Sequence, residues 1–364
     1  MNQNKPIWVA GLMSGTSLDG VDAACLYTDG VDILGFGSSA YVPYSAKERE
    51  VLRSGLGKWP GDTSLHEVGV VVRDLHMQAL QNLPTVDLIG FHGQTLSHDP
   101  QNGRTHQLGD GAELARLVGT PVIWDFRSED VAKGGQGAPL APIYHWALAR
   151  YAKLLEPIAI VNLGGVGNLT WVDPRLPAEN GLLAFDTGPA NAPLNDYMIK
   201  KLNKSYDEDG NLAAQGVADL NLVARFMRDG YFARPVPKSL DRGDFSYIGS
   251  VVESLSNEDA AATLTAIIVA GVLQALEHLP QNPKQMWITG GGRKNTELMR
   301  LLRSAMPMRV CDIDEMGFDG DMVEAQAFAY LAARVARGFP TSFAKTTGVA
   351  TPLSGGRMSI AEVF

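Results

Sequence analysis

The chain has 364 residues, of which 45% are hydrophobic and 20% are charged, and its formal net charge at pH 7 is -9. This length favours two domains, and this composition is typical of a globular protein rather than a disordered or fibrous one. The acidic charge argues against a nucleic-acid or membrane-surface partner, because such partners need a basic face. A few local donors can still bind a phosphate group within an acidic protein.

Cysteine content and the apolar segments indicate a cytoplasmic protein. Its two cysteines, Cys25 and Cys311, each lie in an apolar stretch, which predicts buried reduced thiols rather than a disulfide. The first twenty residues lack the basic and apolar regions of a signal peptide. The most apolar long segment, residues 260–276, contains polar side chains and is shorter than a membrane span, so we expect a buried helix there.

The N-terminal part opens with three short runs typical of strands: Ile7–Met13, Val21–Tyr27 and Ile33–Tyr41. Their short connections predict an antiparallel meander. Helical and strand patterns then alternate, with helices over 65–83 and 111–118 and strands over 86–91 and 122–125.

The same order begins again near residue 157. Strands are expected over 157–163, 169–172, 182–185, 285–289 and 308–311, and helices over 192–202, 217–228, 260–277, 296–306 and 323–337. This period is far too long for a solenoid and predicts a duplicated α/β domain with a cleft between the halves. We expect an N-terminal domain over 1–130, with 340–364 packed on it, and a C-terminal domain with helical insertions over 131–339.

Three glycine-rich turns carry the chemistry, and the first is the hairpin Gly11–Asp22 (GLMSGTSLDGVD). Its backbone N–H groups and hydroxyls can cradle a phosphate chain. Asp19 and Asp22 are placed to hold Mg²⁺ directly or through water. The alternative is an ordinary tight turn that needs glycine for its backbone angles.

The second turn contains Asp186, in the stretch Ala184–Asn191 (AFDTGPAN). We expect Asp186 at the end of a buried strand, which places its carboxylate on the cleft floor. The following turn and helix N-terminus would offer N–H donors to an anion. The alternative makes Asp186 the N-terminal cap of that helix.

The third turn is Gly290-Gly291-Gly292, between a strand and a helix, where backbone without side chains lets a purine and ribose approach closely. In this order the three turns resemble the ATP signature of the actin-like ATPase superfamily. That resemblance implies an α/β fold of two actin-like ATPase (ribonuclease H-like) domains with a nucleotide and substrate cleft between them. No Walker or Rossmann motif competes with it.

Further blocks sharpen the resemblance to one family, the anhydro-N-acetylmuramic acid kinases. They are Gly90–Thr95 (GFHGQT), Gly134–Pro139 (GGQGAP), Asn162–Asn168 (NLGGVGN) and the stretch that begins at Glu324 (EAQAFAYLA). With the three turns, they span almost the whole chain in the family's order.

The resemblance implies a bifunctional reaction that uses ATP and Mg²⁺. Asp186 matches the family's catalytic aspartate. It would take a proton from the water that attacks C1 of the 1,6-anhydro sugar, while O6 of the sugar leaves C1 and attacks the γ-phosphate of ATP. It also implies nucleotide contacts at Gly15, Thr16, Ser17, Leu18, Asp19, Gly20, Val21, Asp22, Gly164, Gly165, Asn168, Gly188, Gly290, Gly291, Gly292 and Asn295.

Five side chains are predicted to contact the sugar. His92, Gln94 and Thr95 follow a strand end, where open α/β sheets bind ligands. Arg127 would meet the lactyl carboxylate, and Glu324 a sugar hydroxyl. The alternatives are a hydrogen-bonded core histidine for His92, an ion pair with a neighbouring aspartate for Arg127, and a helix N-terminal charge for Glu324.

Three positions depart from the family pattern and leave the exact substrate preference open: Ala190, Asn195 and Glu129 replace Gly, Asp and Arg. The loop Pro237–Phe245 keeps the family's Lys238, Ser239 and Arg242. The alternatives to this kinase are a hexosamine kinase without ring opening and, in another class, an actin-like filament or chaperone. A homodimer is common for metabolic enzymes of this size.

Overall fold

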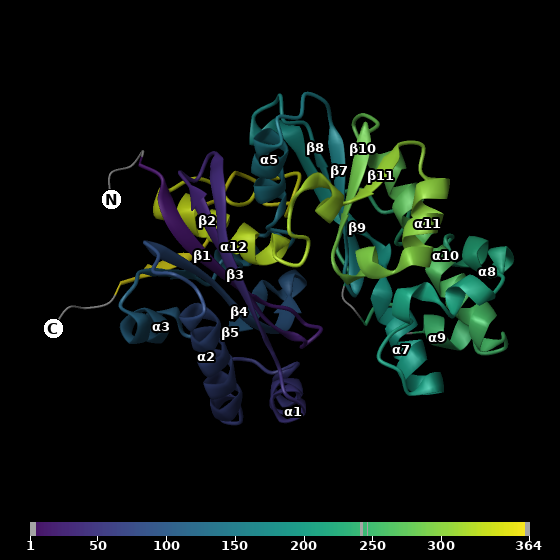
Figure 1. Ribbon diagram of the computed structural model, residues 1–364, viewed down its shortest axis with the longest axis horizontal. Coiled ribbons are helices and arrows are strands. Elements are labelled where there is room, and N and C mark those ends of the chain that lie inside the picture. Colours follow the sequence, from purple (N-terminus) through teal and green to yellow (C-terminus); the bar gives the residue numbers. More distant parts are fainter. Residues whose placement is uncertain (1–4, 241–242, 246, 361–364) are drawn as a thin grey trace. The chain divides into compact units, whose positions relative to one another are not determined.

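The structure is a computed structural model that describes residues 5–240, 243–245 and 247–360 (Figure 1). Arg242 of the loop noted above lies outside these residues. The chain divides into two compact units. The first comprises Met1–Leu154, Pro177–Asn180 and Met322–Phe364, and the second comprises Leu155–Leu176 and Gly181–Asp321.

The first unit is built on a mixed sheet. Its strands are β1 (Ile7–Ser14), β2 (Gly20–Thr28), β3 (Ile33–Pro43), β4 (Leu88–Asp99), β5 (Arg104–Leu108), β6 (Val122–Trp124) and β12 (Arg357–Ser359). Strands β1 to β3 form the predicted antiparallel meander, and β4 and β6 continue the sheet in parallel. The sheet order is β12-β6-β4-β1-β2-β3, with β5 paired to β4.

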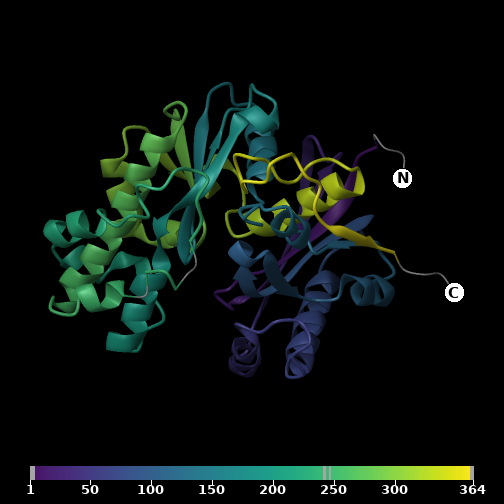
Figure 2. The same ribbon diagram turned by 180° about the vertical axis from the view of Figure 1, so that it is seen from behind.

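Helices cover both faces of this sheet. On one face, α1 (Ala46–Gly55), α2 (Leu65–Gln81) and α3 (Gly111–Val118) share a core with the strands. On the other face lies α12 (Val323–Ala336), drawn in yellow against the sheet in Figure 2. A Cβ at Gly11 or Gly90 would overlap the backbone of α12, so these glycines allow the helix its close approach. Two more helices, α4 (Ser128–Ala132) and α5 (Pro142–Tyr151), complete the unit.

The second unit repeats the strand order of the first. Its strands are β7 (Ile158–Leu163), β8 (Val166–Val172), β9 (Leu182–Pro189), β10 (Gln285–Thr289) and β11 (Arg309–Asp312). Strands β7 to β9 form an antiparallel meander, and β10 and β11 extend it in parallel. The order β9-β8-β7-β10-β11 matches β3-β2-β1-β4-β6. The predicted duplication of an α/β domain is therefore confirmed.

Helices α10 (Asn257–Ala275) and α11 (Thr296–Ala305) share the main core of the second sheet. The shorter elements of this unit are α7 (Asn191–Leu202), α8 (Leu220–Phe226) and α9 (Ile248–Val251), with single turns that include η5 (Gly291–Lys294). The short helix α6 (Ala178–Gly181) falls mostly in the first unit. Within the described residues, the segment Asn257–His278 is long and apolar enough to cross a membrane, but 72% of its apolar window is buried in the fold. It is the buried core helix that the sequence predicted.

The division of the chain differs from the predicted limits of 1–130 and 131–339. Helix α5 packs against β3 and α12, and α12 packs on β1, β2 and β4. Both helices therefore belong with the first sheet, and the observed divisions fall after Leu154 and after Asp321. Cys25 and Cys311 are buried free thiols, as predicted.

Candidate active site

The turn between β1 and β2 presents unpaired donors to solvent. Leu18 is buried with a φ of 57°, and its N–H donates to the Gly15 carbonyl at 3.2 Å. The Leu18 side chain therefore fixes the turn to the core. Thr16 and Ser17 are exposed, and no described residue is hydrogen-bonded to their backbone N–H groups or hydroxyls. These groups have the chemistry that a phosphate chain requires.

Gln94 supports this hairpin from within β4, which runs to Asp99 and does not end at residue 91 as predicted. The buried Ser14 hydroxyl bonds to the Gln94 side-chain oxygen and lies 2.5 Å from the Tyr44 hydroxyl. The Gln94 amide nitrogen donates to the Gly15 carbonyl at 3.3 Å. Gln94 is fully buried and bonded within the first unit, so it holds the hairpin in place. Its predicted contact with the sugar stays a prediction.

The two aspartates of the hairpin differ in exposure. The Asp19 side chain is exposed, while its backbone carbonyl accepts from the Tyr44 N–H at 2.9 Å. Asp22 lies on β2 opposite Met13 and is half-buried. Across the described residues, no group of three His, Cys, Asp or Glu side chains could hold a metal. One or two carboxylates suit Mg²⁺, which keeps several waters and binds substrate phosphates.

His92 and Arg127 form a hydrogen-bonded pair in the first unit. His92 is buried, its Nδ1 lies 2.8 Å from the Gly93 carbonyl, and Arg127 Nε lies 3.1 Å from His92 Nε2. The neutral tautomer with a proton on Nδ1 satisfies both contacts. Burial and the Arg127 charge lower the pKa of His92 well below its ordinary value. The alternative of a hydrogen-bonded core histidine fits these contacts, and His92 orients Arg127.

Arg127 is also fixed by the Gly134–Pro139 segment, since its Nη1 donates to the Gly137 carbonyl at 2.7 Å. That segment is fastened in turn by the buried Asp130, which accepts from the Gly137 N–H at 2.6 Å and the Thr347 hydroxyl at 2.7 Å. Burial lowers the pKa of Arg127 to about 10, so its guanidinium stays charged at neutral pH. An oriented cation is what carboxylate recognition needs.

Glu324 and Thr95 lie in the same unit. Glu324 occupies the first turn of α12, and the residue is exposed. Desolvation of its carboxyl by the surrounding protein raises the pKa of Glu324, and the positive charge of Arg127 opposes this shift. The helix-terminus alternative therefore fits its position. The Thr95 hydroxyl is half-buried and accepts from Gln107 Nε2 at 3.3 Å. Glu129, the departure from the family pattern, is exposed on α4.

Asp186 lies within β9 and not at its end. The strand continues to Pro189, with Asn168 opposite Asp186, Gly167 opposite Gly188, and Thr187 as the extra residue of a bulge. The expected Thr-Gly-Pro turn is thus part of the strand. The alternative of a helix cap is wrong, because α7 begins at Asn191 after a residue that gives no side-chain cap.

The segment after Lys238 holds the Asp186 carboxylate. The Asp186 N–H donates to the Lys238 carbonyl at 2.9 Å, and the Leu240 N–H donates to the Asp186 carboxylate at 2.8 Å. The Tyr231 hydroxyl donates to the Asp186 carbonyl at 2.6 Å. The sequence did not single out Leu240 or Tyr231. The backbone donor of Leu240 carries no sequence signal, and Tyr231 lies 45 positions from Asp186 in the sequence.

Burial dominates the electrostatics of this carboxylate. Desolvation raises the pKa of Asp186 to about 7, although the Leu240 hydrogen bond opposes the shift. A carboxylate with a pKa near the working pH is suited to accept a proton in catalysis. Strongly perturbed pKa values often mark functional positions.

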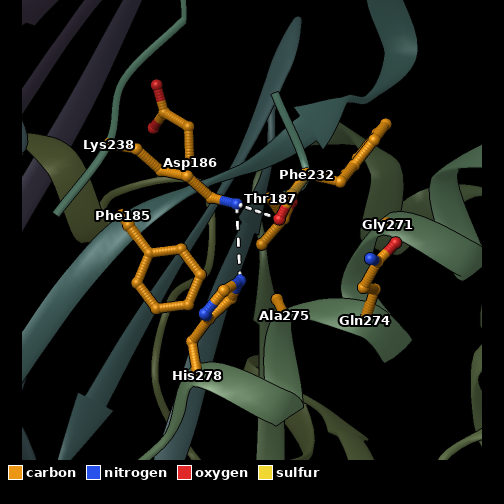
Figure 3. Close-up of a pocket in the computed structure, with 9 residues that line it drawn as sticks. All are labelled: Phe185, Asp186, Thr187, Phe232, Lys238, Gly271, Gln274, Ala275 and His278. Atoms are coloured by element: carbon orange, nitrogen blue, oxygen red, sulfur yellow. Dashed lines mark hydrogen bonds between the residues drawn. The ribbon is translucent and has the colours of Figure 1, made fainter. Parts of the chain in front are cut away.

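The Lys238 side chain anchors the segment that holds Asp186. Figure 3 shows its amino group directed into a small pocket under β9, whereas the Asp186 carboxylate points away from that pocket. Lys238 Nζ donates to the Phe232 carbonyl at 2.9 Å and lies 3.5 Å from His278 Nε2. Burial lowers the pKa of this amino group. Lys238 is therefore a positioning residue.

We expect Lys238→Met to lower kcat about tenfold, because loss of one hydrogen bond to a charged group costs about 1.5–3 kcal/mol. The freed segment would withdraw the Leu240 N–H, so the pKa of Asp186 should rise and the acid limb of the pH–rate profile should move to higher pH. The measurement is kcat against pH, with the exposed Lys284→Met as the control. A lower Tm without a shift of the acid limb of the pH–rate profile would contradict the positioning role of Lys238.

The start of α7 does not offer the anion site that the sequence predicted. The N–H groups of Asn191 and Ala192 donate to the carbonyls of Gly164 and Gly165 at 2.9 and 3.2 Å. The turn between β7 and β8 therefore caps α7 from within the unit. Gly164 and Gly165 lie beside strand β9, which carries Asp186. Their carbonyl groups, and not their N–H groups, point toward α7.

Only one of the three glycines of the third turn has open space beside it. An added Cβ at Gly290 or Gly292 would meet the end of β7 at Leu163, whereas at Gly291 it would meet no atom within 4 Å. Gly291 is exposed, so its backbone is open to a flat ligand. Asn295 caps α11, accepting from the Leu298 N–H at 2.9 Å. Its predicted nucleotide contact stays a prediction.

A sequence profile of the family described as anhydro-N-acetylmuramic acid kinase matches residues 7–360. The chain belongs to the anhydro-N-acetylmuramic acid kinase family. It is 52% identical over 357 residues to anhydro-N-acetylmuramic acid kinase 1 of Jannaschia sp., covering 97% of this chain and 95% of that one. It is 54% identical over 361 residues to the enzyme of Cereibacter sphaeroides, covering 98% and 97%. Family membership makes the chain a kinase.

One solved structure with a distant likeness shows the same extent of chain. Component A of the Acidaminococcus fermentans (R)-2-hydroxyglutaryl-CoA dehydratase superposes with a TM-score of 0.45 at 11% identity, covering 91% of this chain and 99% of that one. This likeness is too low to inform the chemistry of this chain.

Proposed function

We propose that this protein uses ATP to open 1,6-anhydro-N-acetylmuramic acid with water and to phosphorylate O6, giving N-acetylmuramic acid 6-phosphate in cytoplasmic murein recycling. Water oxygen bonds to C1 as the C1–O6 bond breaks. O6 bonds to the γ-phosphorus as ATP releases ADP. The proton lost by water passes to the Asp186 carboxylate.

The environment of the Asp186 carboxylate is the observation that carries this proposal. Its carboxylate is held by a backbone N–H, and desolvation raises its pKa to about 7. A simple transfer to a free hydroxyl also uses a base, but only ring opening consumes a water at C1. The family relatives, named for the anhydro sugar, support that substrate.

The hairpin and the third turn supply the nucleotide contacts in this proposal. The exposed donors of Thr16 and Ser17 would bind phosphate oxygens, and the open backbone at Gly291 would receive the adenosine. Asp19 and Asp22 would hold Mg²⁺ through water, and the ion would neutralise charge on the transferring phosphoryl group. Arg127 would bind the lactyl carboxylate, with its guanidinium oriented by His92.

The test is an ATP-coupled assay with the anhydro sugar, open-ring N-acetylmuramic acid and N-acetylglucosamine as separate substrates. We expect turnover with the anhydro sugar and little with the open sugars. Turnover with only the open sugars would make the protein a simple hexosamine kinase. ATP-dependent sedimentation without sugar turnover would favour a filament.

The pH dependence follows from the raised pKa of Asp186. A base must be deprotonated, so kcat/KM should fall about tenfold for each pH unit below about 7 and level off above it. The measurement is kcat/KM for the anhydro sugar between pH 5 and 9 at saturating ATP. A flat profile across pH 5–7 would contradict a base with this pKa.

A further inference from the structure

A second pocket, of about 670 Å³, lies in the first unit. Its volume falls in the range of about 300–1,000 Å³ that is typical of small-molecule sites. None of the residues predicted to contact nucleotide or sugar lines it. Its walls come from α2, β5 and the turn that follows it, α3, Phe91 within β4, and the end of β6.

The first sheet separates this pocket from the His92 side chain. Phe91 lines the pocket and packs against His76 of α2 at 4.9 Å between ring centroids. The next residue, His92, points to the opposite face and packs on Phe328 of α12 at 4.5 Å. The pocket therefore lies on the opposite face of the sheet from the His92 side chain, and of the Arg127 surroundings it takes in Asp125 and Ser128.

Gly69 leaves one wall of the pocket open. It lies in the interior of α2, where glycine costs roughly 1 kcal/mol of helix stability relative to alanine. An added Cβ at Gly69 would meet no atom within 4 Å, so no neighbouring protein atom requires glycine there. The space beside the residue opens into the pocket that it lines.

The charged groups of the wall are already paired. Arg73 lies 3.2 Å from Glu113, and Arg357 lies 2.9 Å from Asp125. The Asp110 carboxylate accepts from the first N–H groups of α3. A charged ligand would have to separate one of these pairs, whereas a neutral ligand can use their donors and acceptors without disturbing them.

An aromatic ring lies among these paired groups. The Trp124 indole is half-buried, lines the pocket, and is fixed by a 3.0 Å hydrogen bond from its Nε1 to the Ser359 hydroxyl. Val70 and Leu108 add apolar surface. Sugars present an apolar C–H face bordered by hydroxyls that both donate and accept. This combination matches an aromatic ring surrounded by neutralised donors and acceptors.

We propose that this pocket binds a neutral sugar of mono- to disaccharide size, independently of the kinase reaction. N-acetylglucosamine is a suitable probe, with glucose 6-phosphate and glucosamine as anionic and cationic counterparts. The readout is the NMR signal of the Trp124 indole N–H, assigned among the six tryptophans with Trp124→Phe. This signal reports on the pocket and not on Asp186.

We expect N-acetylglucosamine to shift the Trp124 signal in a saturable way, and Gly69→Leu to weaken that binding at least tenfold by occupying the part of the pocket beside α2. Leucine favours the helix, so the variant should fold. Gly249→Leu in α9, where an added Cβ also meets open space, is the matched control and should bind as the wild type does.

Three results would overturn the proposal. They are no Trp124 shift with the neutral sugar, an equal shift in Gly69→Leu, or tighter binding of either charged probe. Kinase turnover, measured in parallel, distinguishes a failure of sugar binding in this pocket from a failure of the proposed function. Loss of turnover in the wild type leaves the Trp124 titration unaffected.

Discussion

Replacement of Asp186 by asparagine is expected to lower kcat for the anhydro sugar about 10³-fold, since general-base catalysis contributes roughly 10²–10⁴-fold. The amide keeps the shape of the carboxyl but cannot take the proton of the attacking water. The measurement is kcat at pH 8 with the wild type and Asp186→Asn. Asp196→Asn on α7 is the control, because that residue is exposed and is not predicted to take part.

The same substitution should stabilise the protein at high pH. The folded-state pKa of Asp186 is about 7, above the ordinary 3.8, so its carboxyl costs stability as pH rises from about 4 to about 7, and the cost is constant above. At 1.36 kcal/mol per pKa unit this cost is at most ~4 kcal/mol, less because the side chain is partly exposed. Asp186→Asn should therefore raise Tm at pH 8 and have little effect at pH 4. A variant less stable at pH 8 would contradict the assigned pKa.

Replacement of Gly291 by valine should raise the KM for ATP about tenfold to a hundredfold. Its side chain would meet open space in the protein, so Tm should change little, but it would occupy the surface proposed to receive the adenosine. Steric conflict of about 1–3 kcal/mol corresponds to that loss of affinity. The measurement is KM for ATP and for the sugar, with only the former rising.

Two glycine controls sharpen the interpretation of Gly291→Val. Gly249→Val adds a side chain to open space elsewhere in the second unit and should leave both KM values unchanged. Gly290→Val would collide with the end of β7 and should lower Tm. Unchanged KM for ATP in Gly291→Val would remove this turn from the nucleotide site.

Periodic segments of the sequence predicted most of the fold, because their patterns are local. The helix over Gly111–Val118 and the strand over Gln285–Thr289 have the predicted bounds. Helix α5 was not predicted, since eight of its ten residues are buried and no polar face marks a helical period. Strand β5, Arg104–Leu108, is short and polar, and its pairing with β4 is not visible in its own residues.

The site was harder to predict, because its geometry depends on contacts between distant residues. Gln94 bonds to Ser14 across 80 positions of the sequence, and β4 continues past it to Asp99, so a buried structural glutamine was predicted to follow a strand end and contact a ligand. Thr-Gly-Pro normally breaks a strand, but Gly167 of β8 pairs opposite Gly188 and extends β9 past Asp186. The residue types that carry chemistry were visible in the sequence; their hydrogen-bond partners were not.

The most direct test of the central claim is turnover of the anhydro sugar in ¹⁸O-water, quenched early and analysed by mass spectrometry of the sugar phosphate. We expect one ¹⁸O at C1 for each ADP formed, well above the exchange seen when unlabelled product is incubated for the same time. Label in released phosphate, or no label at C1 beyond that exchange, would contradict water attack at C1 coupled to phosphorylation of O6.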